Sequence, residues 1–360
     1  MKTYDVAVAG ALGLVGTTMV HILEEYDFPV GRLVLLEQRD LVGAPVRFKG
    51  QTLYTEEARE EAFQEVDIAL FATNEEVSQD LVPKAVRQGA IAIDNSRVYR
   101  LDPDVPLVVP EVNPEDLDWH HGIIASPNCT TIATIVVLKP LHDLSRITRV
   151  VASTYQSASG GAVRGMLELR KQAMDVAAGF APTPPSVFQY QLAFNLIPFI
   201  DVFEADGYTR EEWKMIHETR KMLHDPGMRI TDTAIRVPTL VCHAVSCNIE
   251  TERKVTAGEA RAALGRAPGV KVVDDIETLE FPQPIEVAGG NLTHVGRIRE
   301  DFSIENGLNL WLVSDNVRKG AAQNAVQIAQ ALVERGLLEK RQTLGDAVFH
   351  RRRTAGPIAR

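Results

Sequence analysis

The chain has few cysteines and lacks any long, uninterrupted apolar segment. Its three cysteines, Cys129, Cys242 and Cys247, are too few for a disulfide framework and are typical of a protein in a reducing cytoplasm. No apolar run approaches the ~20 residues that a membrane-spanning helix requires. The amino terminus carries Asp5, several glycines and no small-residue cleavage site, so it predicts a first strand and not a signal peptide. We therefore expect a cytoplasmic protein.

The chain also has fewer basic residues than acidic residues. The 360 residues include 38 Lys and Arg against 48 Asp and Glu, which gives a net charge of −10. This balance argues against a nucleic-acid or membrane-surface binder and favours small-molecule chemistry. The hydrophobic content of 45% is ample for a buried core and suggests one large or two medium domains.

The first third of the chain alternates between short apolar runs and helical periods. Strand-like runs occupy residues 4–10, 32–37, 66–73 and 90–95, and helical periods occupy residues 17–26 and 75–89. This alternation predicts a doubly wound, parallel α/β sheet of the Rossmann type. We assign residues 1–128 to this domain.

The following region has a different pattern. Its strand-like stretches are longer and rich in Val, Thr and Ile (146–156, 228–252, 307–316), and helical stretches at 164–179 and 210–225 separate them. Such a pattern predicts an α+β domain over residues 129–316. An amphipathic helix within 317–338 is expected to pack back on the first domain. Residues 341–360 form a basic tail that we expect to be flexible. No internal repeat is present.

A glycine loop follows the first predicted strand. Gly10, Gly13 and Gly16 allow a tight turn and the close approach of backbone N–H groups to a pyrophosphate, and the next helix adds the positive end of its dipole. We therefore predict that this loop, with Leu14 and Val15, binds a dinucleotide. After the second strand an acid would favour NAD and an arginine would favour NADP, and the segment offers both in Glu37, Arg39 and Asp40.

Cys129 lies where a strand-like segment gives way to a helical one. It could be a packed thiol, a redox sensor or a nucleophile, and a helix N-terminus favours the last because it lowers a thiol's pKa. A nucleophile needs a proton acceptor, for which His243 is the better candidate because it interrupts an apolar strand; a satisfied core histidine is the alternative. His120 and His121 are expected to be solvated. Cys242 and Cys247 are interpreted as buried strand residues, and no metal site is predicted.

Seven ordered blocks of sequence carry a resemblance that covers about Asp5 to Gln327. They read "GALGLVG", "IDNSRVYRLDPDVPLVVPEVNPE", "SPNCTTI", "STYQSASGGAVRGM", "REEWKMIHETRKML", "RVPTLVCHAVSCNIE" and "WLVSDNVRKGAAQNA". The sequence resembles aspartate-β-semialdehyde dehydrogenase. The resemblance implies an NADP-dependent reduction of L-aspartyl-4-phosphate to L-aspartate-4-semialdehyde in lysine, threonine and methionine biosynthesis, with NAD as the alternative cofactor. It also implies that residues 129–316 mediate catalysis and assembly into a homodimer or homotetramer.

The resemblance further implies residue roles. Cys129 matches the nucleophile that carries a thioester, and His243 matches the acid/base group. Substrate contacts are implied for five residues: Gln156, Arg236, Glu211, Lys214 and Arg100. Cofactor contacts beside the nicotinamide are implied for Ser159, Gly160 and Asn316, and Arg39 is the candidate for contact with a 2′-phosphate.

Three segments depart from the family pattern. "EQRDL" replaces a "Ser-x-Arg-Ser" type of element, Thr73 and Asn74 replace a Gly-Gly pair, and Cys242 and Ala244 replace small residues beside the histidine. The reaction itself has two rivals: another acyl-phosphate or acyl-CoA reductase of this scaffold, such as an N-acetylglutamyl-phosphate or malonyl-CoA reductase, and a non-catalytic nucleotide-binding paralogue.

Overall fold

The computed structural model describes residues 2–338, so the predicted basic tail at 341–360 lies outside the described residues. The chain folds into two compact units. The first holds the chain up to Pro127 and again from Ala322, and the second holds Asn128–Ala321. None of the helices within residues 2–338 has the length and apolar character needed to cross a bilayer.

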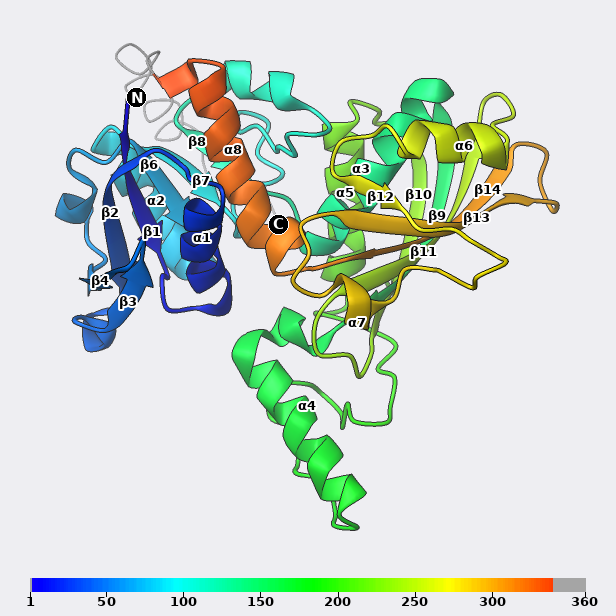
Figure 1. The fold of residues 1–360 in the computed structure, drawn as a ribbon, viewed down its shortest axis with the longest axis horizontal. Coiled ribbons are helices and arrows are strands. Elements are labelled where there is room, and N and C mark those ends of the chain that lie inside the picture. Colours follow the sequence, from blue (N-terminus) through cyan, green and yellow to red (C-terminus); the bar gives the residue numbers. More distant parts are fainter. Residues whose placement is uncertain (1, 339–360) are drawn as a thin grey trace. The chain divides into compact units, whose positions relative to one another are not determined.

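A six-stranded parallel sheet forms the centre of the first unit (Figure 1). Its strands are β1 (Tyr4–Ala9), β2 (Val30–Glu37), β5 (Glu56–Glu57), β6 (Ile68–Phe71), β7 (Ile91–Asp94) and β8 (Ile123–Ala125). Their order is β5-β2-β1-β6-β7-β8, which is the order of a dinucleotide-binding doubly wound sheet. The predicted fold class is therefore confirmed. Strands β6 and β7 are buried along their whole length, as expected for parallel strands covered on both faces.

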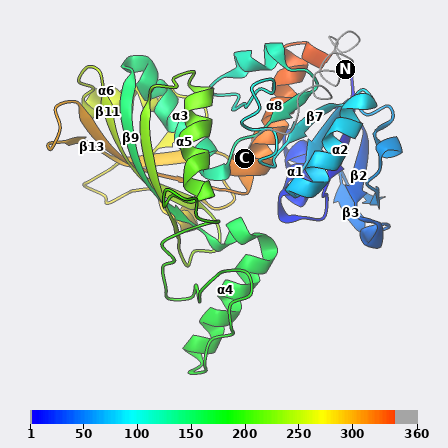
Figure 2. The same ribbon diagram turned by 180° about the vertical axis from the view of Figure 1, so that it is seen from behind.

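Helices cover both faces of this sheet. Helix α1 (Leu14–Glu25) packs with α8 (Gln323–Glu334), and α2 (Glu75–Arg87) packs on β6, β7 and β8 on the other face (Figure 2). Asn74 is the N-cap of α2, and its side chain accepts a hydrogen bond from the Val77 N–H. A small hairpin of β3 (Pro45–Phe48) and β4 (Gln51–Tyr54) follows β2.

The carboxyl-terminal helix returns to the first unit as predicted, but it begins later than residue 317. Residues Arg318–Ala322 form a single π-helical turn before α8. Within this turn the Gly320 N–H donates to the Asp315 carbonyl, five residues back, which is the hydrogen bond of a π turn. A Cβ at Gly320 would lie only 3.0 Å from Cys129 Cβ, so the turn passes close to the predicted nucleophile.

A six-stranded mixed sheet forms the second unit. Its strands are β9 (Ile147–Gln156), β10 (Arg229–Arg236), β11 (His243–Thr251), β12 (Val270–Val272), β13 (Thr293–Asp301) and β14 (Gly307–Ser314), in the order β10-β9-β11-β14-β13-β12. Helices α3 (Cys129–Leu144), α5 (Arg210–Met222) and α6 (Ala257–Leu264) pack on the sheet, with α3 in contact with the other two. Helix α4 (Ala162–Ala177) extends away from the sheet, and α7 (Pro284–Val287) is a single short turn (Figure 1).

One predicted strand is wrong in detail. The stretch 228–252 forms two strands, β10 and β11, separated by residues 237–242. Pro238 has no N–H to donate to a ladder, and Cys242 has a φ of 73°, which takes the chain out of extended geometry. Cys242 is therefore buried but precedes the strand, whereas Cys247 lies within β11.

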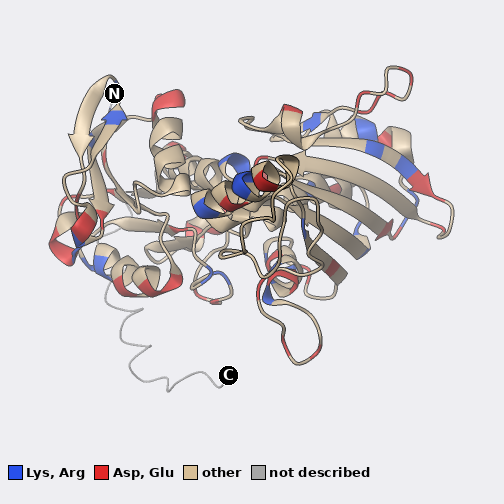
Figure 3. Ribbon diagram, turned by 90° about the horizontal axis from the view of Figure 1, so that it is seen from below, with Lys and Arg blue, Asp and Glu red and all other residues tan. Residues whose placement is uncertain are grey.

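Charged residues are sparse on the central strands of both sheets (Figure 3): β6 has none, and β11 has only Glu250.

Candidate active site

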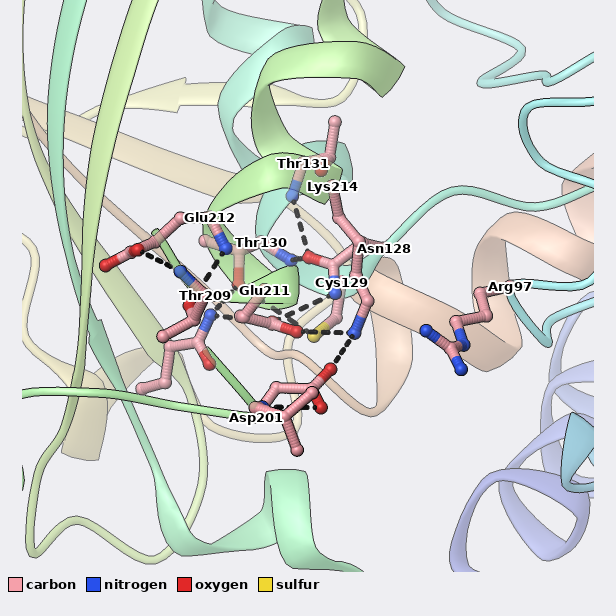
Figure 4. Close-up of polar contacts among 12 residues, drawn as sticks. Arg97, Asn128, Cys129, Thr130, Thr131, Asp201, Thr209, Glu211, Glu212 and Lys214 are labelled. Atoms are coloured by element: carbon pink, nitrogen blue, oxygen red, sulfur yellow. Dashed lines mark hydrogen bonds and ion pairs between the residues drawn. The ribbon is translucent and has the colours of Figure 1, made fainter. Parts of the chain in front are cut away.

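Cys129 is the first residue of α3. Its neighbour Asn128 is the N-cap, and the Asn128 side-chain oxygen accepts hydrogen bonds from the Thr130 N–H at 2.9 Å and the Thr131 N–H at 3.3 Å (Figure 4). The first turn of α3 contains no acidic residue of its own, and Cys129 lies at the positive end of the helix dipole. Cys129 is partly exposed and is not in a disulfide. This position favours a thiolate.

Glu211 on α5 connects Asn128 to the sheet. One carboxylate oxygen accepts from Asn128 Nδ2 at 3.0 Å, and the other pairs with Lys214 Nζ at 2.8 Å (Figure 4). The first oxygen also accepts from Gln156 Nε2 at 3.0 Å. Lys214 also contacts Asp201 at 3.0 Å. Glu211 and Lys214 therefore share one face of α5. The contacts of Glu211 also reach Asn128, which lies 83 residues away in the sequence.

Burial and neighbouring charges shift the pKa values of Glu211 and Lys214. Burial acts to raise the pKa of Glu211, but the charge of Lys214 and hydrogen bonds from Lys214, Gln156 and Asn128 outweigh it and lower that pKa to about 2. Burial acts to lower the pKa of Lys214, yet the attraction of Glu211 and Asp201 raises it. Glu211 is therefore an anion and Lys214 a cation throughout the physiological range.

His243 begins β11 and is buried. Its Nδ1 accepts the backbone N–H of Ser157 at 3.1 Å, so the ring proton of the neutral imidazole is assigned to Nε2. Nε2 is buried and has no hydrogen-bond partner among the described residues. Burial, followed by the charge of Arg236, lowers the pKa of His243 to about 3. The ring is therefore neutral at ordinary pH and presents one donor that the fold does not use.

The buried imidazole predicts an acid-sensitive protein. The unfolded chain protonates His243 below about pH 6.5, whereas the folded chain keeps it neutral down to a pKa of about 3, so acid favours unfolding in that window. Each pH unit within the window costs about 1.4 kcal/mol. Between pH 6.5 and pH 5, urea unfolding should show that wild type loses about 2 kcal/mol more of its unfolding free energy than His243→Asn. Equal losses would contradict a buried neutral His243.

Arg236 ends β10 beside these groups. Its Nη1 donates to the Ser157 carbonyl at 2.8 Å, and its guanidinium lies 5.4 Å from the centre of the Phe188 ring. Burial lowers the pKa of Arg236, with the negative charge of Glu211 and Cys129 acting in the opposite direction. A Cβ at Gly160 would lie 2.5 Å from Nη1, so a larger residue at that position would displace the guanidinium group.

A second group surrounds Asn316. Its side-chain oxygen accepts from Ser159 Oγ at 2.9 Å, Ser157 Oγ at 3.2 Å and the Cys242 N–H at 3.0 Å. The structure therefore joins Ser159 and Asn316, two predicted cofactor contacts, to the same serine that orients His243. The positive φ of Cys242 is a backbone conformation that favours glycine.

The glycine loop in the first unit fits a dinucleotide. Gly10 has a φ of 78°, and a Cβ at Gly16 would lie 2.0 Å from the Gly10 carbonyl oxygen, so larger residues would not allow this turn. Helix α1 starts after Gly13 with no side-chain cap and no acidic residue in its first turn, which includes Leu14 and Val15. The uncapped N–H groups and the dipole suit a pyrophosphate.

Two predicted contacts lie elsewhere in the first unit. Arg100 is buried and donates from Nη2 to the Asn95 carbonyl at 2.7 Å. Arg39 opens a short 3₁₀ turn after β2 and is exposed. The two thiols besides Cys129 are unsuited to nucleophilic chemistry, because burial raises the pKa of Cys247 to about 12 and raises that of Cys242 as well.

Three residues of the second unit were missed by sequence reasoning. Ser157 orients His243 through its backbone, Asp201 pairs with Lys214, and Glu218 accepts the Asn128 N–H at 2.6 Å. Only Glu218 had a usable signal, since it lies seven residues after Glu211 on the same face of α5. A backbone donor and a loop aspartate leave no comparable pattern in the sequence.

Comparisons with known proteins show which family the chain resembles. A family model described as "Semialdehyde dehydrogenase, NAD binding domain" matches residues 5–120, and one described as "Semialdehyde dehydrogenase, dimerisation domain" matches residues 138–319. The aspartate-semialdehyde dehydrogenase of Aquifex aeolicus is 47% identical over 93% of this chain and 99% of its own length.

Solved structures show the same likeness. A Vibrio cholerae aspartate semialdehyde dehydrogenase II, complexed with ASA, superposes with a TM-score of 0.90 at 41% identity and covers 93% of this chain and 99% of its own. A Candida albicans enzyme with NADP has a TM-score of 0.72 at 22% identity over 92% of this chain and 99% of its own, which indicates a shared fold.

Proposed function

The chain belongs to the aspartate-semialdehyde dehydrogenase family and is an NAD(P)-dependent oxidoreductase, and from this premise we propose that it reduces L-aspartyl-4-phosphate to L-aspartate-4-semialdehyde through a thioester on Cys129. One observation carries the proposal. A continuous set of hydrogen bonds connects the Asn128 cap of Cys129 through Glu211 to Gln156, and the next residue, Ser157, holds both His243 and Arg236. The proposed pathway is lysine, threonine and methionine biosynthesis.

Cys129 performs the covalent step. Its thiolate attacks the acyl carbon of the aspartyl phosphate, and phosphate leaves with the electron pair of the broken C–O bond, which gives a thioester. When bound, the nicotinamide supplies the hydride that reduces this carbonyl. The resulting thiohemiacetal then releases the aldehyde and returns the electron pair of its C–S bond to the Cys129 sulfur.

His243 and the ionic groups assist this step. The His243 Nε2–H donates to the oxygen that becomes negative during reduction, because it is a buried donor with no other partner among the described residues. Arg236 binds the substrate α-carboxylate, where its planar fork matches two oxygens. Glu211 attracts the substrate ammonium, Gln156 orients the acyl group, and Lys214 binds the phosphate. Arg100 is a further substrate contact that the sequence resemblance implies.

The family relatives favour this reaction over its rivals. A reductase for N-acetylglutamyl phosphate or malonyl-CoA has no support from the named relatives, and a non-catalytic paralogue would have no need of the arrangement around Cys129. The cofactor is a nicotinamide dinucleotide. Its identity, NADP by the sequence resemblance or NAD, depends on the side chains at the end of β2.

We also propose that the enzyme is a cytoplasmic homodimer. Free cysteines support a reducing compartment. Helix α4 and the segment after it expose large apolar side chains, with Leu167 57%, Phe180 71% and Met174 72% exposed. An exposed apolar surface of this kind is typical of an interface, and the matched dimerisation domain includes these residues.

A steady-state assay tests the reaction. Continuous turnover of aspartate semialdehyde by the purified chain should require both inorganic phosphate and an oxidised nicotinamide dinucleotide, because phosphate must release the acyl group from Cys129. Absorbance at the reduced nicotinamide band measures the rate. Lack of turnover with aspartate semialdehyde, together with turnover of N-acetylglutamate semialdehyde or malonate semialdehyde with CoA, would refute the proposal in favour of a rival.

A further inference from the structure

The carboxyl end of β2 carries a buried acid beside the glycine loop. Glu37 is the last residue of β2, the strand next to β1, and its side chain is only 7% exposed. One of its carboxylate oxygens accepts the Leu12 N–H at 2.7 Å, so the acid is fixed against the loop that follows β1. In a dinucleotide-binding sheet, the side chain at this position contacts the adenosine ribose.

Further acids surround Glu37. Glu57 on β5 is its in-register neighbour on the adjacent parallel strand, so both side chains leave the same face of the sheet. Glu56 precedes Glu57, and Asp40 lies three residues after Glu37 in the exposed turn. Arg39 is the single cation within residues 37–41. Residues 37–41 and 56–60 together carry five carboxylates and two guanidinium groups, those of Arg39 and Arg59.

We propose that this enzyme uses NAD in preference to NADP, and that Glu37 determines the preference by accepting hydrogen bonds from the ribose 2′- and 3′-hydroxyls. The inference rests on the proposed function, since it names the cofactor of that reaction. The carboxylate has lone pairs left after its bond to Leu12, and hydroxyl groups are donors that can fill them. The ribose hydroxyl groups can donate hydrogen bonds to the neighbouring carboxylates without adding a net charge to the site.

A 2′-phosphate has the opposite effect. It is an anion with acceptor oxygens only, and it would meet a carboxylate that is held in place and screened little by water. Arg39 is exposed, so water screens its attraction for a phosphate, whereas the repulsion from the buried Glu37 is screened little. The geometry therefore rejects the phosphate while it binds the hydroxyl.

Kinetics with both cofactors test the inference. For wild type, kcat/KM with NAD should exceed kcat/KM with NADP by ~10²-fold, since like-charge contacts suppress wrong ligands by several tens to hundreds of fold. Glu37→Gln keeps an oxygen for the Leu12 N–H and removes the charge, so it should reduce the NAD:NADP ratio at least ~10-fold, mainly through KM. The double variant Glu37→Ser with Asp40→Ser should reduce the ratio further.

Controls separate this inference from the proposed function. Glu24→Gln removes one exposed carboxylate from α1 and should leave the ratio unchanged. Fluorescence titration with NADH and NADPH measures cofactor binding without turnover, so it applies even if a variant is inactive, and Asp40→Ser replaces an exposed residue if Glu37→Gln fails to fold. Tighter binding of NADH without turnover of aspartate semialdehyde would refute the proposed function and support the cofactor inference. Preference of wild type for NADP would overturn the inference, as would an unchanged ratio in Glu37→Gln.

Discussion

Cys129→Ala is expected to abolish turnover while leaving nucleotide binding nearly intact. The variant has no sulfur to carry the acyl group, so the only remaining route is direct reduction of the acyl phosphate without a thioester. The glycine loop that binds the dinucleotide lies in the first unit and is not altered. Steady-state rates with aspartate semialdehyde and phosphate measure the loss, and NADH fluorescence measures the retained binding.

A cysteine elsewhere in the second unit supplies the control. Cys247→Ala makes the same chemical change at a thiol that is 1% exposed and whose pKa burial raises to about 12. We expect this variant to lose some stability through the lost packing volume but to keep its turnover. Normal activity of Cys129→Ala would refute the nucleophile assignment, and equal loss in both variants would point to packing damage.

His243→Asn is expected to lose ~10²- to 10⁴-fold in kcat, because a positioned donor or acid acts only as charge develops in the transition state. Asparagine keeps a donor but is shorter, so it does not reach where Nε2 lies. Because the pKa of His243 is lowered to about 3, wild-type kcat should show no titration of this residue between pH 5 and pH 8. Initial rates across that range test both points.

His294→Asn is the matched control for this substitution. His294 lies on β13, is partly buried and takes no part in the network around Ser157, so its substitution should leave kcat unchanged. Thermal melting distinguishes a catalytic from a structural role. A His243→Asn protein that folds normally and keeps full activity would contradict the proposed role, and one that fails to fold would favour a core histidine.

Most of the fold could be predicted from the sequence because its signals are local. Alternating apolar runs and helical periods indicate parallel strands with crossover helices, and β6 and β7 show the expected complete burial. Pro238 is a sequence signal for a break in the strand, but the positions at which β10 ends and β11 begins, and the π turn before α8, could not be predicted. Both depend on backbone conformations at single residues, the positive φ of Cys242 and the Gly320 bond to Asp315, which periodicity does not reveal.

Only part of the candidate site could be predicted from local sequence signals. Cys129 and the glycine loop have local signals, namely a junction of strand and helix and a spacing of glycines. Glu211 and Lys214 resemble an ordinary surface pair in sequence, and only tertiary contacts show that Glu211 is buried against Asn128 and Gln156. The sequence did not reveal that Glu57 lies beside Glu37 at the end of β2, because this pairing depends on the register of two strands.

The most direct test of the covalent mechanism is a peptide mass spectrum. Wild-type protein should be incubated with aspartate semialdehyde and an oxidised nicotinamide dinucleotide in the absence of phosphate, then quenched in acid and digested. The peptide that contains Cys129 should carry an aspartyl group as a thioester, and the group should disappear when phosphate is added before the quench. The Cys129→Ala protein should carry none. Rapid production of reduced nicotinamide without any acyl group on Cys129 would contradict the account.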